Sequence, residues 1–172
     1  MNYKKNQIGV GLVEVLVALV LLALGVLGYT ALQLRAVDAT GEALNRSQAT
    51  LILRGLTESI RANPDGQGSY PAAVQGYLGL GKKTAAPKCL NSACIPAEMA
   101  KYDAYMAADA AQTMGMVITM AECPGVKSVK RQCLFAAWDD TAPKLKATDY
   151  SKCMDSKGIY VPSARCLMME AY

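Results

Sequence analysis

The chain has 172 residues, a formal net charge of +4 at pH 7, six cysteines and no histidine. Without histidine it cannot build a Ser-His-Asp or Cys-His catalytic arrangement, and no Gly-rich phosphate loop follows a predicted strand. Zinc is disfavoured as well, because the cysteines lack a C-x2-C spacing. We therefore expect neither an enzyme nor a protein that holds a metal or another cofactor.

The most informative segment is the apolar run from Ile8 to Leu34, which follows Lys4 and Lys5 and contains one acid, Glu14. As a helix it would extend roughly 40 Å, whereas a bilayer core of about 30 Å needs only about 20 residues. A carboxylate inside such a helix costs about 2.5–3.5 kcal/mol on insertion scales, so Glu14 calls for a partner or a function. The segment is predicted to be a membrane anchor that carries a functional acid.

Three interpretations of this N-terminus compete. A secretory signal peptide would have an apolar region of roughly 7 to 15 residues and a small-residue cleavage site, and this run is longer and lacks a good site. A plain N-terminal anchor would leave Glu14 unexplained. The third is a processing site, in which a hydrophilic leader ending in Gly9 precedes Val10-Gly11-Leu12-Val13-Glu14. This pattern resembles the class III signal of the type IV pilin and pseudopilin family.

The resemblance implies that a prepilin peptidase cuts between Gly9 and Val10, and that Val10 is then N-methylated. Glu14 becomes the fifth residue of the mature chain, where the family has its glutamate. Most major pilins have phenylalanine at the position of Val10, whereas minor pilins vary there. Intramembrane charges usually pair, and the resemblance implies that Glu14 meets the cationic N-terminal amine of a neighbouring subunit. The alternative is an acid that is merely tolerated near the membrane interface.

Beyond the anchor, the helical pattern continues to residue 63. Apolar and small residues recur at steps of three and four, as on an amphipathic helix: Leu34, Val37, Gly41, Leu44, Gln48, Ile52, Leu56 and Ile60. Asn63-Pro64-Asp65-Gly66 ends the helix, because the residue before proline leaves the α region and Asp-Gly favours a turn. The predicted parts are a leader (1–9), a transmembrane and assembly half-helix (10–34), an amphipathic half-helix (35–63) and a globular part (64–172).

Lys4 and Lys5 flank one end of the anchor, and the positive-inside bias sends everything after Arg35 across the membrane. We expect a bacterial inner-membrane protein whose C-terminal part lies in the periplasm, where disulfides persist. The order of the cysteines suggests three sequential pairs: Cys89 with Cys94, Cys123 with Cys133, and Cys153 with Cys166. Six cysteines allow 15 connectivities, so this pairing rests on proximity alone.

The globular part is predicted to be one small α+β domain. Residues 64–94 are rich in Gly, Pro, Ala and Lys and are expected to form a loop. A short helix begins at Pro96, and its predicted core stripe is Met99, Tyr102, Met106, Ala110 and Met114. Antiparallel strands are expected at 115–121 and 132–138, with an interrupted last strand at 159–161 and 165–169. Asp139 and Asp140, at a strand end, are interpreted as turn residues and not as a carboxylate site.

Two further segments resemble minor pilins, the low-abundance members of the family. Residues 61–66 read Arg-Ala-Asn-Pro-Asp-Gly, and residues 94–103 have the form C-x-P-x-x-x-A-x-x-D. The resemblance implies the type IV pilin fold, with a long N-terminal helix packed on a small antiparallel sheet, and a subunit that primes pilus assembly in a tip complex. The partners that it implies are the prepilin peptidase, other minor pilins, the major pilin and a tip adhesin.

Two other functions stay open. A minor pseudopilin of a type II secretion system would share the N-terminal signal and the long helix. The neighbouring genes would distinguish this function from that of a pilus subunit. A surface-binding role, in adhesion or DNA capture, could coexist with assembly. Loss of Lys4 and Lys5 with the leader leaves 16 basic and 14 acidic residues. This excess of positive charge is too small to indicate a nucleic-acid-binding surface. We therefore do not expect nucleic acid as the main partner.

Overall fold

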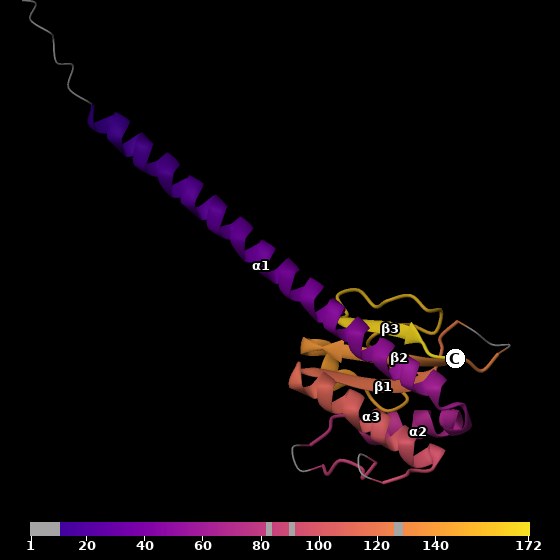
Figure 1. The fold of residues 1–172 in the computed structure, drawn as a ribbon. Helices are drawn as coiled ribbons and strands as arrows, with labels where there is room; N and C mark the ends of the chain where they lie inside the picture. Colours follow the sequence, from indigo (N-terminus) through magenta and orange to yellow (C-terminus); the bar gives the residue numbers. More distant parts are fainter. Residues whose placement is uncertain (1–10, 82–83, 90–91, 126–128) are drawn as a thin grey trace, which may run out of the picture. The chain divides into compact units, whose positions relative to one another are not determined.

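The computed structural model describes residues 11–81, 84–89, 92–125 and 129–172. The chain forms two compact units, one that ends at Gly41 and one from Glu42 to Tyr172. Helix α1 (Leu12–Ala62) supplies the described structure of the first unit, and its residues from Glu42 onward belong to the second (Figure 1).

The second unit is a small α+β domain. After α1 come the 3-10 helix η1 (Pro64–Ser69), α2 (Tyr70–Gly76) and α3 (Pro96–Thr113). The strands β1 (Met116–Glu122), β2 (Gln132–Trp138) and β3 (Cys166–Glu170) form an antiparallel sheet in the order β1-β2-β3, and a second 3-10 helix, η2 (Asp139–Lys144), follows β2. The predicted fold class, a long N-terminal helix on a small antiparallel sheet with a short helix and disulfides, is confirmed.

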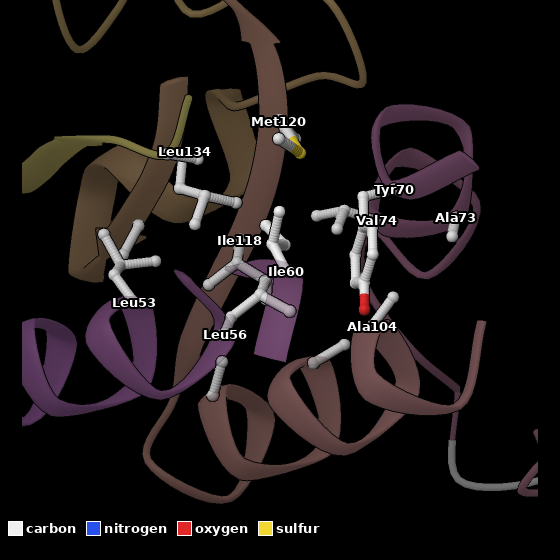
Figure 2. Close-up of a cluster of buried hydrophobic side chains, with 14 of the residues drawn as sticks. Leu53, Leu56, Ile60, Tyr70, Ala73, Val74, Ala104, Ile118, Met120 and Leu134 are labelled. Carbon is white, nitrogen blue, oxygen red and sulfur yellow. The ribbon is translucent and has the colours of Figure 1, made fainter. Parts of the chain in front are cut away.

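Both faces of the sheet are buried along β1 and β2. On one face, alternate residues of β1 and β2 such as Ile118 and Leu134 meet Leu53 and Ile60 of α1 (Figure 2). The other face carries the intervening residues, which are covered by the segment between η2 and β3. Because strand side chains alternate between faces, burial on both sides explains why the strands read as continuous apolar runs.

The predicted loop over residues 64–94 is wrong for its first part, since η1 and α2 occupy residues 64–76. The prolines that suggested a loop, Pro64 and Pro71, lie in the first turns of these helices, where a missing amide donor costs nothing. Tyr70 and Val74 are fully buried and hold α2 against the core. Composition alone therefore concealed two short helices.

The predicted core stripe of α3 is also wrong. The buried residues of this helix are four alanines, Ala100, Ala104, Ala108 and Ala111, whereas Met106 is 47% exposed and Met114 is 44% exposed. Alanine side chains let the helix axis come close to neighbouring elements, and Figure 2 shows Ala104 beside Tyr70. Side-chain size, and not hydropathy, selected the inward face.

The stripe predicted for α1 is correct at its C-terminal end only. Leu56 and Ile60 are buried, together with Ala49, Leu53 and Thr57, whereas Leu44 is 58% exposed. The strand expected at 159–161 does not form in this described stretch, where Tyr160 makes only an isolated bridge with Met154. The other strands lie within one residue of their predicted bounds.

Candidate functional site

The apolar part of α1 presents an uncovered surface. Its most apolar 18-residue window has a mean hydropathy of 2.6 and no buried residue, and large side chains such as Leu12 (77% exposed) and Leu24 (61%) point outward. A regular helix satisfies its own backbone hydrogen bonds, which is the condition for crossing lipid. By length and composition this helix can span a membrane.

Glu14 is the one charged residue between Gly11 and Leu34. It lies in the first turn of α1, where its amide N–H donates to the carbonyl oxygen of Gly11 at 2.9 Å. The positive end of the helix dipole favours an acid at this position. No ion pair of Glu14 occurs within the described residues, and its side chain is exposed on the apolar surface. Gly9 and Val10, the predicted processing and methylation site, lie outside the described residues.

The two signature segments, 61–66 and 94–103, meet in the structure. The Asn63 side-chain amide donates to the carbonyl oxygen of Pro96 at 2.8 Å and to the hydroxyl oxygen of Tyr70 at 3.2 Å. The Tyr70 hydroxyl donates in turn to a carboxylate oxygen of Asp103 at 2.6 Å. A side chain at Gly66 would collide with Asn63 and with the Pro96 carbonyl. Both segments therefore serve one polar cluster, which we call the Asn63 cluster (Asn63, Tyr70, Pro96 and Asp103).

Tyr70 is the member of this cluster that the sequence did not reveal. Its side chain is fully buried, and the structure directs its hydroxyl toward α3 (Figure 2). Burial, with the hydrogen bond to Asp103, raises the pKa of Tyr70 well above its usual range. A tyrosine before a proline carries no recognised signal, so only the fold could identify its role.

The six cysteines form the three sequential pairs that were expected: Cys89–Cys94, Cys123–Cys133 and Cys153–Cys166. The third pair is fully buried and joins the segment after η2 to β3, beneath one face of the sheet. The second pair joins the end of β1 to the start of β2 across the hairpin. The first pair closes a short loop just before α3.

A separate set of contacts lies where the second unit begins. The indole N–H of Trp138 donates to one carboxylate oxygen of Glu42 at 2.9 Å, and Arg46 pairs with the other oxygen at 2.9 Å. Arg165 pairs with Asp139 at 2.7 Å. The hydrogen bond to Asp139 raises the pKa of the Arg165 guanidinium further above its usual value. Glu42, Arg46 and Arg165 border an open groove of about 600 Å³.

Comparison with protein-family models gives two matches that adjoin along the chain. Residues 4–30 match the prokaryotic N-terminal methylation motif, and this range contains Gly9, Val10 and Glu14. Residues 31–105 match the model described as Tt1218-like, type IV pilin Tt1218, and this range contains both segments of the Asn63 cluster. No curated protein and no solved structure matches the chain.

Proposed function

We propose that this chain is a member of the type IV pilin family and, within it, a minor pilin that helps to prime pilus assembly as part of a tip complex. The family is one of structural subunits. Its methylation motif implies processing by a prepilin peptidase and assembly with other pilins. Within the family we assign the chain to the minor pilins called PilV, or pilus modification proteins, on the strength of residues 61–66 and 94–103.

One observation carries the proposal: an uncovered apolar helix with a single carboxylate, Glu14, in its first turn. In our proposal the leader 1–9 is cut off between Gly9 and Val10, and the new N-terminus of Val10 is methylated. Residues 10–34 hold the subunit in the inner membrane, with residues 64–172 in the periplasm. On assembly the N-terminal amine of a neighbouring subunit neutralises Glu14, and residues 35–63 carry the helix into the globular part.

The partners in this proposal are the prepilin peptidase, other minor pilins, the major pilin and a tip adhesin. In this proposal the subunit is held in the inner membrane before assembly and is then incorporated into the pilus on the cell surface. A minor pseudopilin of a type II secretion system would use the same helix and the same acid. Deletion of the gene separates the two, because loss of surface pili and twitching supports the pilus, whereas intact pili with blocked secretion would support the pseudopilus.

Glu14→Val and Glu14→Gln test the proposed role of the carboxylate. Both variants should enter the membrane at least as well as the wild type, since an insertion cost of about 2.5–3.5 kcal/mol is removed. Co-purification of other minor pilins and the number of surface pili per cell should nevertheless fall, because a subunit amine loses its counter-charge. Val15→Leu is a control on the same turn. Normal co-purification and piliation in both Glu14 variants would contradict the proposal.

A further inference from the structure

The groove at the start of the globular unit has features that the pilin helix does not use. Its walls are Glu42 and Arg46 of α1 on one side and residues 160–165 on the other. Glu42 and Arg46 are the first two charged residues of this unit in chain order. They lie eight and twelve residues after Leu34, the last residue of the helix segment through which we propose that subunits associate.

Both arginines of the groove keep donors free for a ligand. Arg46 pairs with Glu42 through Nε only, and Arg165 pairs with Asp139 through Nη1 only. A guanidinium has five N–H donors in a planar fork that suits a carboxylate. Each arginine side chain is about half exposed, at 49% and 50%. Two forks thus border one groove with most of their hydrogen-bonding capacity unused by the described residues.

The groove wall is held in place by unusual backbone and by a buried aromatic residue. In the described part of the chain, Asp139 and Ser163 are the two non-glycine residues with positive φ, at 48° and 63°. Asp139 forms the ion pair with Arg165, and Ser163 lies two residues before Arg165 in the chain. Such conformations persist where the surrounding structure enforces them, and they concentrate at binding sites. Trp138 lies beneath the groove, where it is buried, and its indole N–H fixes the carboxylate of Glu42 on the opposite wall.

We propose that this groove binds an extended, carboxylate-bearing segment of a partner pilin. In this proposal Arg46 and Arg165 donate hydrogen bonds to the carboxylate. The inference rests on the proposed function, since it takes the partner from the assembly of pilins. The charges of the site favour a peptide over a polyanion, because each arginine is paired with a carboxylate, Glu42 or Asp139, and these four groups together carry no net charge. A nucleic acid, with a phosphate at every step, would meet these two carboxylates as well as the arginines.

The test places a photo-crosslinking amino acid at Pro162 of the full chain, in cells that express the other pilins. Pro162 is exposed on the groove wall, and the φ that proline imposes is open to other residues. Peptide mapping should find a cross-link to a segment of another pilin that contains Asp or Glu. The same crosslinker at Gln112, on the exposed side of α3, should not reach that segment.

Arg46→Gln combined with Arg165→Gln should reduce the cross-link at least about tenfold, because two charge-assisted hydrogen-bond sets are lost. Arg61→Gln is the matched control, since Arg61 also forms an exposed ion pair on α1, with Glu58 at 3.0 Å, and should leave the cross-link unchanged. Emission of Trp138, the single tryptophan, checks that the groove stays folded. If the double variant stays folded and cross-links like the wild type, the proposal is wrong.

Two other outcomes would also overturn the inference. One is a cross-link to nucleic acid. The other is the absence of any cross-link to a pilin while the full chain still co-purifies with the other minor pilins. In the second case the proposed function stands, because association through α1 is intact and only the groove has lost its assigned partner. If co-purification fails as well, both proposals fail.

Discussion

Tyr70→Phe removes one hydroxyl from the Asn63 cluster and leaves the ring in the core. The lost hydroxyl donates to Asp103 at 2.6 Å and accepts from Asn63 at 3.2 Å. A hydrogen bond to a charged group contributes about 1.5–3 kcal/mol. Asp103 is half-buried and regains some solvation from water, while Asn63 keeps its bond to Pro96. We therefore expect a loss near the lower end, about 1.5–2 kcal/mol in the free energy of unfolding.

The measurement is urea unfolding of the full chain in detergent micelles, followed by the fluorescence of Trp138. The same loss corresponds to a fall in melting temperature of roughly 5–10 °C for a domain of this size. Tyr102→Phe is the control, because no hydrogen bond of the Tyr102 hydroxyl occurs among the described residues, and it should change stability by less than about 0.5 kcal/mol. If Tyr70→Phe unfolds at the wild-type urea concentration, the Asn63 cluster does not stabilise the fold.

The stability of the same variant should also depend on pH differently from that of the wild type in alkaline solution. The pKa of Tyr70 is raised in the folded state, first by burial and then by the hydrogen bond to Asp103. The stabilisation from neutral Tyr70 is thus complete below its ordinary pKa of about 10 and is lost as the pH rises above that value toward the folded-state pKa. The wild type should lose stability above about pH 10, and Tyr70→Phe should lose less over the same range.

Three other perturbations test other parts of the structure. Replacing Gly9 with a bulky residue should leave full-length precursor in the inner membrane, and intact Met1 on the wild-type protein beside an active prepilin peptidase would refute the processing site. Removing the Cys153–Cys166 disulfide by serine substitution should lower the free energy of unfolding by about 3 kcal/mol, from its 13-residue separation; a loss below about 1 kcal/mol would show that the chain is restrained by packing alone. Ala104→Leu should cost about 1–3 kcal/mol by overpacking, whereas Met106→Ala should be nearly neutral, and the reverse order would restore the methionine stripe as the core.

The fold could be predicted from sequence wherever one strong local signal decides. The apolar run, the Asn63-Pro64 stop and the apolar strands each specify an element without help from distant residues. The inward face of α3 could not be predicted this way. Met106 is the more apolar residue, but Ala104 is buried because the neighbouring Tyr70 leaves room for only a small side chain. The aromatic ring of Tyr70, 34 positions before Ala104 in the chain, therefore determines which side of α3 faces the core.

The same distinction between local and long-range signals applies to the candidate functional residues. Glu14 stands out in the sequence because a carboxylate in an apolar helix is conspicuous on its own, and its role in assembly stays a prediction. The groove could not, because Arg46 and Arg165 lie far apart in the chain and each resembles an ordinary surface charge. The fold brings them together through Trp138, whose strand ends beside Asp139 and whose indole holds Glu42.

The signature segments and the exposed charges therefore carry different information. Asn63 and Asp103 are half-buried and are joined through the Tyr70 hydroxyl, and this cluster fixes the end of α1 against α2 and α3. The hydrogen-bonding groups of Asn63 are used within the cluster, and the Asp103 carboxylate already accepts from Tyr70. Residues that distinguish one pilin from another must instead lie on exposed surface. The arginines of the groove meet that condition, so partner choice should change with substitutions there and not within the Asn63 cluster.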